Sequence, residues 1–375
     1  MRRNSLVAGL LGVALVALVA VADQPDRPAT APKKVGPMAE AIHADLSRRA
    51  AGGFSGAIIV EIDGEVVLDT GYGWADRERR TPFTTSTIAQ IGSLTKQFTA
   101  AAILDLSRQK RLRLSDPISK YLPDVPSPAA GITLEQLLTH TAGLQSDCGD
   151  DFEHLSREDF VHRCLALIDH PPGTRFQYSN LGYSALAAVV ESVTRQPLED
   201  VVRNRFLDPL HMLRTGTFFS ARFHDQQAIG YVGPAAQPLM SDRLSAMEGS
   251  YWNLKGNGGM EASAEDMYAW FRALTRPSPI SESVKRQLMT PHARRDDTVE
   301  YGYGWFIRRN AVNEIEQASH TGSDGVFFSA IVWRPKERAF YYLVTNTGEK
   351  GGAEAASVTL KTLKGRLPIA GAAIR

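Results

Sequence analysis

The stretch SLTKQFTAAAILDL (residues 93–106) decides the fold predicted for this chain. Its apolar residues occupy most of the circumference of a helix rather than one stripe. That distribution is typical of a helix buried on all sides. We therefore predict a helix in the interior of the protein, which the segments before and after it must cover.

Two β-rich runs precede this helix. FSGAIIVEI (residues 54–62) and EVVLDTGYG (residues 65–73) flank Asp63-Gly64, and such a pair between two runs predicts a hairpin. Farther upstream, AEAIHADLSRRA (residues 39–50) places Ile42, Leu46 and Ala50 at steps of four, which predicts a helix.

Strand character returns near the other end of the chain. Four runs are rich in β-branched and aromatic residues and are separated by Gly, Pro or charged residues: YGWFIRR (303–309), EIEQASH (314–320), VFFSAIVW (326–333) and AFYYLVTN (339–346). They predict an antiparallel meander. GGAEAASVTLKTLKG (351–365) has Ala and Leu at helical spacing, which predicts a helix covering one face of the sheet.

These segments predict an α/β fold, an antiparallel sheet flanked by helices with an inserted, mostly α-helical domain. The sheet domain is assembled from residues 38–106 and 298–365. Residues 107–297 form the helical insert, and residues 366–375 form a C-terminal tail.

The first 37 residues have a different composition. Arg2 and Arg3 precede the apolar run LVAGLLGVALVALVAV (residues 6–21), and Ala20-Val21-Ala22 follows with small residues, which predicts a signal peptide over residues 1–22. The alternatives are an uncleaved anchor or a buried helix, but the run is shorter than the about 20 residues that a spanning helix needs. The Pro-rich residues 23–37 read as a linker. We predict an exported protein, periplasmic or secreted, with no stable membrane anchor after cleavage.

Composition excludes several classes of protein. The 375 residues are 43% hydrophobic and 22% charged, near the averages for globular proteins, which argues against disorder, collagen and a multi-span membrane protein. A formal net charge of +1 gives no bulk attraction to nucleic acid or anionic lipid. We therefore expect a small-molecule or peptide substrate and no nucleic-acid partner.

Only two cysteines are present, Cys148 and Cys164. An exported chain with an even number of cysteines can pair them, so we predict a disulfide, with two free or buried thiols as the alternative. There is no C-x-x-C or H-E-x-x-H spacing, so we predict no metal site.

The buried helix also carries a candidate for chemistry. Ser93 and Lys96 are three residues apart and so share one helix face. Serine is a weak nucleophile until a base takes its proton, and desolvation lowers the pKa of a lysine enough for it to be that base. A second S-x-x-K, Ser107 to Lys110, lies in the charged run SRQKRLR and is interpreted as a solvated surface.

Two further motifs follow in the chain. Tyr178-Ser179-Asn180 lies between a Pro-Gly turn and a predicted helix, where a tyrosine can move protons and an amide can orient substrate. Tyr251-Trp252-Asn253 repeats this pattern and is interpreted as a decoy. His320-Thr321-Gly322 ends a predicted strand, where exposed backbone amides can line a cleft.

Taken in this order, the three motifs resemble those of the penicillin-recognising serine hydrolases, specifically the class C β-lactamase-like branch that includes DD-peptidases and family VIII esterases. Supporting similarities are GYGWAD (71–76), LLTHTAGL (137–144), GNGGMEASAEDM (256–267) and YGYGW (301–305). The resemblance covers roughly residues 38–362.

The resemblance implies a role for each matching position. Ser93 is the acylated nucleophile, Lys96 its base partner and Tyr178 a proton relay. Asn180 holds the substrate amide or the lysine. Substrate docks along His320, Thr321 and Gly322, and the backbone amides of Ser93 and Ser323 form the oxyanion hole. No metal or organic cofactor is implied. His140, in LLTHTAGL, is interpreted as structural rather than as a base, because Lys96 and Tyr178 fill the base roles.

Two departures bear on substrate. His320 stands where class C β-lactamases carry Lys, and an ordinary histidine is mostly neutral at pH 7. Asp324 follows the docking strand, where it can repel a carboxylate. We predict a serine hydrolase acting on D-alanyl peptides or small esters, with weak β-lactam hydrolysis. The alternatives are a true class C β-lactamase and a catalytically silent peptide- or muropeptide-binding module.

Overall fold

The computed structural model of the chain describes residues 33–219 and 221–365. The predicted signal peptide (residues 1–22) and C-terminal tail (residues 366–375) lie outside the described residues. Within the predicted linker, Lys33–Lys34 form a short strand, β1, and helix α1 begins at Pro37. In the described ranges, no helix combines the length and apolarity needed to cross a membrane.

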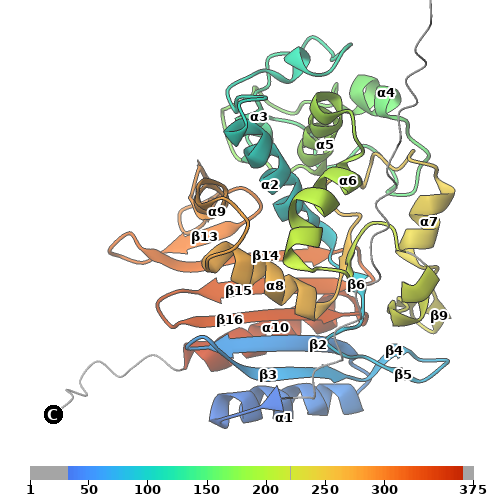
Figure 1. Cartoon of the computed structure of the whole chain (residues 1–375), viewed down its shortest axis with the longest axis vertical. Coiled ribbons are helices and arrows are strands. Elements are labelled where there is room, and N and C mark those ends of the chain that lie inside the picture. Colours follow the sequence, from blue (N-terminus) through green and yellow to red (C-terminus); the bar gives the residue numbers. More distant parts are fainter. Residues whose placement is uncertain (1–32, 220, 366–375) are drawn as a thin grey trace, which may run out of the picture. The chain divides into compact units, whose positions relative to one another are not determined.

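A nine-stranded antiparallel sheet organises the fold, and its strands come from both ends of the described chain (Figure 1). Its order is β1-β3-β2-β16-β15-β14-β13-β12-β11. The early strands and the late strands join where β2 pairs with β16, with Ile58 opposite Leu343. This arrangement confirms the predicted fold class. The strands are β1 (Lys33–Lys34), β2 (Gly56–Ile62), β3 (Glu65–Tyr72), β11 (Ala293–Arg294), β12 (Glu300–Tyr301), β13 (Phe306–Arg309), β14 (Ile315–Ser323), β15 (Phe328–Arg334) and β16 (Ala339–Thr345).

The predicted strands are present, with differences at their ends. Asp63 and Gly64 join β2 to β3 with φ values of 52° and 87°, the positive values that a tight hairpin turn needs. The predicted meander is β13 to β16. Strand β14 runs past its predicted end at His320 to Ser323, because residues 321–323 still pair with β15. The two-residue strands β11 and β12 are too short to show alternation in the sequence.

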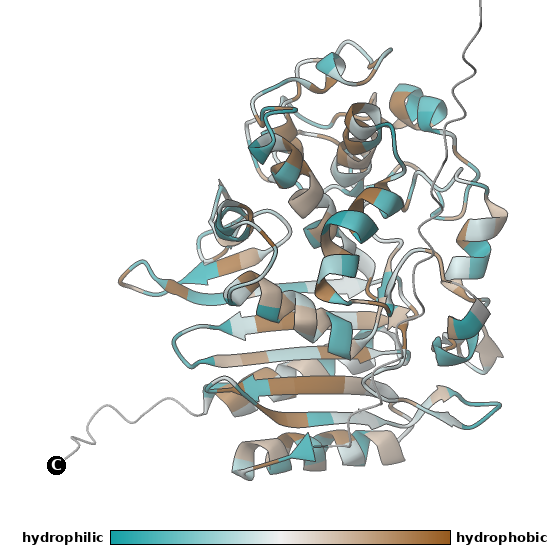
Figure 2. Cartoon of the chain, viewed as in Figure 1, coloured by the Kyte–Doolittle hydropathy of each residue, from teal (hydrophilic) through white to brown (hydrophobic). Residues whose placement is uncertain are grey.

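Helices cover both faces of the sheet. Helices α1 (Pro37–Ala51) and α10 (Gly348–Lys364) share one core with the sheet, to which Ile58 contributes. Helix α8 (Ala264–Thr275) and the helical region share the other core, to which Ile59 contributes. With both faces covered, all seven residues of β2 are buried, and the strand is strongly apolar along its length (Figure 2).

The segment between β3 and β11 is mostly helical. Helix α2 is buried from Thr95 to Leu106, which confirms the predicted interior helix. The helices are α2 (Thr95–Arg108), α3 (Leu134–Leu138), α4 (Arg157–Asp159), α5 (Asn180–Thr194), α6 (Leu198–Val202), α7 (Met240–Ala246), α8 and α9 (Glu282–Met289).

This segment also contains short strands. The hairpins are β4 (Trp74–Asp76) with β5 (Thr81–Pro82) and β8 (Tyr231–Val232) with β9 (Ala235–Ala236), and the small sheet is β6 (Ala89–Gln90), β10 (Glu261–Ala262) and β7 (Thr215–Gly216). Strand β11 lies inside the predicted insert, residues 107–297, yet joins the main sheet. The predicted domain boundaries stay a prediction.

Candidate active site

Ser93 lies in a 3-10 turn, η1 (Gly92–Leu94), that leads directly into α2. Gly92 has a φ of 51°, which lets the chain turn sharply after β6. Ser93 is half-buried, whereas Lys96, one turn farther along, is fully buried. The start of α2 therefore presents a serine to solvent and keeps the lysine beside it away from water.

Two glycines fix this turn against the sheet. A Cβ on Gly322 of β14 would lie 1.9 Å from the carbonyl oxygen of Ile91, and a Cβ on Gly92 would lie 2.8 Å from the amide nitrogen of Ser323. Ser329 of β15 also donates a hydrogen bond to the Ile91 carbonyl, 2.8 Å away. This backbone-to-backbone contact places the Ser323 amide beside the turn that carries Ser93.

Lys96 is the centre of a hydrogen-bonded cluster. Its Nζ lies 3.0 Å from Ser93 Oγ, 2.7 Å from Asn180 Oδ1 and 2.9 Å from the carbonyl oxygen of Asn257. Burial lowers the pKa of Lys96 to about 7, and the nearby carboxylates of Asp147 and Asp151 oppose that shift. A large share of Lys96 is thus neutral near pH 7.

Tyr178 lies in the loop that precedes α5 and completes the contacts of Ser93. Its hydroxyl is hydrogen-bonded to Ser93, and its ring centre lies 4.9 Å from Lys96 Nζ. Burial raises the pKa of Tyr178 far above its ordinary value, and the bond to Ser93 only partly opposes this. The tyrosine is therefore a protonated phenol at neutral pH.

Asn180 is the first residue of α5, and its side chain contacts Lys96. The helix is capped by Ser179, whose Oγ accepts from the Gly182 amide at 3.3 Å. Asn180 Nδ2 donates to Asp147 Oδ1 at 2.6 Å while its Oδ1 accepts from Lys96. Both ends of the amide are therefore engaged.

His320 lies on β14 and is buried. Its Nδ1 is 2.7 Å from the Thr321 carbonyl and its Nε2 is 3.3 Å from the Tyr301 hydroxyl, and the ring stacks on Phe306. Burial lowers the pKa of His320 to about 3, helped by the charge of Lys96 and opposed by the bond to Thr321. This position therefore carries no positive charge at neutral pH.

The end of β14 has a partner strand on one side only. Pairing with β13 stops at Ser319 opposite Phe306, whereas residues 320–323 pair with β15 alone among the strands of the described chain. Thr321 and Ser323 are exposed here. Next to the Ser93 turn, the sheet thus has an edge without a second partner strand, to which an extended substrate can add.

Asp324 follows this edge and is exposed. Its Oδ1 accepts hydrogen bonds from the amides of Val326 and Phe327, at 2.9 and 2.6 Å. The carboxylate thus closes its own turn at the end of β14.

His140 has the contacts of a structural residue. Its Nδ1 accepts from the Ser179 amide at 3.1 Å, and its ring packs 4.2 Å from that of Tyr178. Burial lowers the pKa of His140 well below its ordinary value. His140 thus supports the loop that presents Tyr178 and Asn180.

The second copies of two motifs, Ser107 to Lys110 and Tyr251-Trp252-Asn253, lie in surroundings different from those of Ser93 and Tyr178. Lys110 is exposed just past the end of α2, in the left-handed conformation with a φ of 60°. Tyr251 is buried and bonded to Glu199, and Asn253 donates to the Asp150 carbonyl. Neither motif contacts Lys96 directly, although the Asn253 carbonyl accepts a hydrogen bond from Asn257.

Two members of the hydrogen-bonded cluster around Lys96 were missed by the sequence analysis. Asn257 lies in the GNGGMEASAEDM string, but a backbone carbonyl leaves no signal in residue type. Asp147 directly precedes Cys148, so the cysteine could have drawn attention to this loop.

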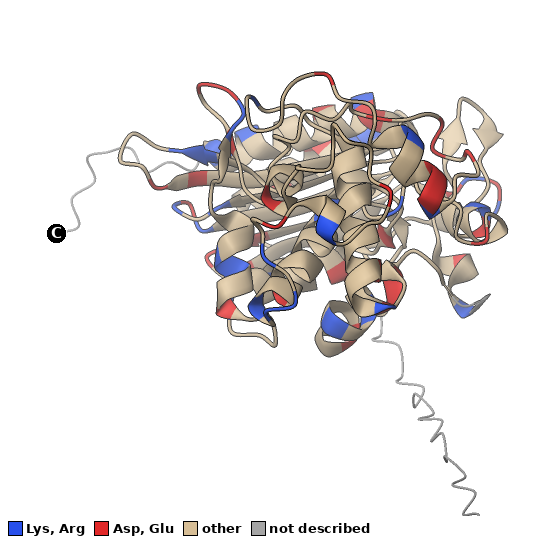
Figure 3. Ribbon diagram, turned by 90° about the horizontal axis from the view of Figure 1, so that it is seen from above, with Lys and Arg blue, Asp and Glu red and all other residues tan. Residues whose placement is uncertain are grey.

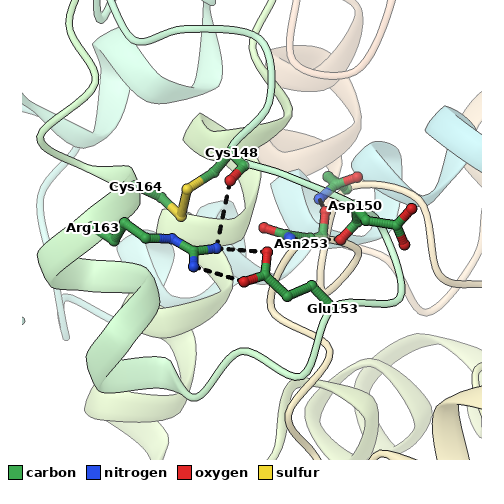
Figure 4. The surroundings of a disulfide bond; sticks show 7 residues. Cys148, Asp150, Glu153, Arg163, Cys164 and Asn253 are labelled. Carbon is green, nitrogen blue, oxygen red and sulfur yellow. Dashed lines mark hydrogen bonds and ion pairs between the residues drawn. A yellow bond between two sulfur atoms is a disulfide. The ribbon is translucent and has the colours of Figure 1, made fainter.

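The structure joins Cys148 and Cys164 by a disulfide, with Cα atoms 5.4 Å apart (Figure 4). Within residues 33–219 and 221–365, no group of three or more His, Cys, Asp or Glu side chains is arranged to hold a metal ion.

Sequence comparison finds relatives of this chain. A family model described as Beta-lactamase matches residues 38–364. Protein flp of Staphylococcus aureus is 29% identical over 305 residues, which cover 77% of this chain and 59% of the relative. Putative penicillin-binding protein PbpX of Bacillus subtilis is 30% identical over 259 residues, covering 68% of this chain and 62% of the relative. The chain thus spans less than two thirds of the length of these curated relatives.

Solved structures with the same fold include penicillin-binding proteins. The octameric penicillin-binding protein homologue from Pyrococcus abyssi superposes with a TM-score of 0.73 and 26% identity, covering 87% of this chain and 76% of that one. The penicillin-binding protein from Bacillus halodurans gives a TM-score of 0.72 and 27% identity, covering 86% of this chain and 99% of that one.

Proposed function

The chain belongs to the beta-lactamase family, a family of serine hydrolases, and on this premise we propose that it cleaves ester or amide bonds through an acyl-enzyme on Ser93. One observation carries the proposal. The fully buried Lys96 has its Nζ 3.0 Å from Ser93 Oγ and a pKa of about 7. A serine attacks a carbonyl only when a neighbouring base takes its proton, and Lys96 is such a base.

The other partners of Lys96 support this role. Asn180 Oδ1 and the Asn257 carbonyl are both acceptors, so they take N–H groups from the amine. A neutral amine has two N–H groups and one lone pair. With both N–H groups donated to these oxygens, the lone pair is directed at the Ser93 hydroxyl.

Tyr178 and two backbone amides complete the proposed mechanism. Because Tyr178 stays protonated, it can donate a proton to the departing group and then regain the proton that Lys96 took from Ser93. The amides of Ser93 and Ser323 would bind the oxyanion, and such donors contribute about 2.7 to 4 kcal/mol each in comparable sites. Water then releases the acid from Ser93.

For the substrate, we propose a D-alanyl peptide or related peptidoglycan stem first, a small ester second, and a slowly hydrolysed β-lactam third. The free edge of β14 at residues 320–323 suits an extended peptide. The neutral His320 offers no fixed charge to a substrate carboxylate, which argues against an efficient class C β-lactamase.

The rival proposal is a catalytically silent module that binds peptides or muropeptides. A binding module has no need to bury a lysine 3.0 Å from a serine hydroxyl, because desolvating a lysine costs free energy. The cluster around Lys96 therefore favours the enzyme.

We further propose that the protein is exported, and that it works without a nucleic-acid partner or a stable membrane anchor. The Cys148–Cys164 disulfide supports export, because disulfides persist in oxidising compartments. Mass spectrometry of the N-terminus after expression tests the proposed cleavage after Ala22.

Covalent labelling tests the proposed activity. A fluorescent penicillin or a fluorophosphonate should label the wild type stoichiometrically and should not label Ser93→Ala. The matched control is Ser107→Ala in the second S-x-x-K, which should label like the wild type. Absence of any adduct in the wild type would contradict the proposal and favour the binding module.

A further inference from the structure

The amide of Asn180 can support Lys96 in only one of its two orientations. In the structure its oxygen faces Lys96 at 2.7 Å and its nitrogen faces Asp147 at 2.6 Å. If the amide rotated by half a turn, its NH2 group would face Lys96 and would take up the amine's lone pair. The lone pair would then point away from Ser93.

We propose that Asp147 is a positioning residue, whose carboxylate holds the Asn180 amide with its oxygen toward Lys96 and so keeps Lys96 directed at Ser93. A carboxylate has no hydrogen to donate, so only the NH2 end of the amide can face it. This inference rests on the proposed acyl-enzyme mechanism and adds to it the residue that orients its base.

The segment that directly follows Asp147 is anchored at two points, Cys148 and Glu153 (Figure 4). The next residue, Cys148, is joined to Cys164. Arg163, the neighbour of Cys164, forms two hydrogen bonds of 2.7 Å with the Glu153 carboxylate. The loop is thus tied to the segment of Arg163 and Cys164 by a covalent bond and an ion pair.

The same loop reaches Lys96 by a second route. Asn253 Nδ2 donates to the Asp150 carbonyl at 2.7 Å, and Asn257 Nδ2 donates to the Asn253 carbonyl at 2.7 Å. The Asn257 carbonyl is itself a partner of Lys96. Both acceptors of the Lys96 amine therefore depend on contacts with residues 147–150.

Asp147 acts on Lys96 through its negative charge as well as through its hydrogen bond to Asn180. Titratable groups around Lys96 are Asp147, Asp151, His140, His320, Tyr178 and Tyr183. The two histidines have pKa values lowered by burial, and the two tyrosines have pKa values raised by burial, so all four are neutral near pH 7. Near pH 7 the two carboxylates therefore supply the charge that raises the pKa of Lys96, although burial raises the pKa of Asp151 itself to about 6. Removing the charge of Asp147 should lower the pKa of Lys96.

Two substitutions separate orientation from charge. Asp147→Asn removes the charge, and in one of its two amide orientations it keeps an oxygen that accepts from Asn180. We expect its acylation rate at the optimal pH to stay within about threefold of the wild type, with the acidic limb about half to one pH unit lower, since Asp147 is exposed and screened. Asp147→Ala removes the acceptor, and its acylation rate should fall roughly tenfold to a hundredfold, because misplaced catalytic groups cost that much.

The measurement is the second-order rate of Ser93 labelling by a fluorophosphonate across pH 5 to 9, together with the melting temperature of each full-length variant. Glu158→Gln, which removes one exposed negative charge from α4, is the control and should match the wild type.

An unchanged labelling rate and pH profile in Asp147→Ala would overturn the inference. It would also be overturned if both Asp147 variants lost the same share of the labelling rate, kept the acidic limb of the wild type and melted at a lower temperature. In either case, labelling of the wild type at Ser93 would leave the proposed function standing. A wild type that is not labelled would contradict the proposed function itself.

Discussion

Lys96 shows how far one residue depends on its surroundings. The lysine of the second S-x-x-K, Lys110, is exposed, whereas Lys96 is fully buried and has a pKa of about 7. The chemical group is the same in both, and the removal of water makes the difference.

The pKa of Lys96 predicts the pH dependence of activity. Lys96 accepts the Ser93 proton only when it is itself neutral, so kcat/KM should rise with pH through about 7 and level off above it. His320 cannot produce this limb, because burial lowers its pKa to about 3. The pH dependence of kcat/KM for a p-nitrophenyl ester measures the pKa of this acidic limb. An acidic limb near pH 10 would contradict the assignment of Lys96 as a buried base.

Substrate preference should respond to the charge at position 320. His320→Lys introduces an ammonium group, which should raise the rate for nitrocefin relative to neutral p-nitrophenyl acetate by about tenfold. His320→Gln, which adds no charge, is the control. The panel should also include D-Ala-D-Ala peptides. If nitrocefin is the best wild-type substrate by a wide margin, the argument from a neutral His320 is wrong.

At the scale of elements, the site depends on how closely the η1 turn approaches β14. Gly92 and Gly322 allow backbone contacts that no side chain would permit. A 3-10 turn and a strand from opposite ends of the described chain thereby place a nucleophile beside a backbone amide.

Gly322→Ala should separate these two elements. The new Cβ would lie 1.9 Å from the Ile91 carbonyl, so the turn must move away from β14. We expect the labelling rate to fall about a hundredfold and the free energy of unfolding to fall by about 1 to 3 kcal/mol. Gly131→Ala is the control, because a Cβ there meets no atom within 4 Å. A normal labelling rate in Gly322→Ala would show that the contact does not position Ser93.

At the scale of the whole molecule, β2 and β16 join the early and late parts of the sheet. All residues of both strands are buried. Acidic and basic residues are interspersed over the described chain (Figure 3), in keeping with a formal net charge of +1. Stability should therefore depend on this apolar seam more than on long-range charge interactions.

Leu343→Ala tests the seam. Leu343 lies opposite Ile58 and is fully buried, so its truncation should cost about 2 to 5 kcal/mol. On heating, the far-UV circular dichroism signal and the labelling of Ser93 should disappear at the same temperature, and this temperature should be lower than in the wild type. The control is Val312→Ala, since Val312 is 71% exposed. If labelling were lost at a temperature well below that at which secondary structure is lost, the pairing of β2 with β16 would not be what supports the site.

The sequence by itself determined what depends on near neighbours. Apolar spacing identified the interior helix and the longer strands, and Asp63-Gly64 identified the hairpin. Helical periodicity predicted that Lys96 lies on the side of Ser93, although Ser93 itself lies in the 3-10 turn before α2. These features follow from backbone geometry, which repeats over a few residues. The three motifs, in order, also indicated the family.

Only the tertiary structure decided what surrounds Lys96. Asn180 and Asn257 reach it from 84 and 161 residues away, and Asp147 acts through Asn180. The pKa values of Lys96 and His320 likewise depend on burial by segments remote in the chain. No local pattern encodes such contacts, because they exist only when the whole chain is packed and water is excluded from the site.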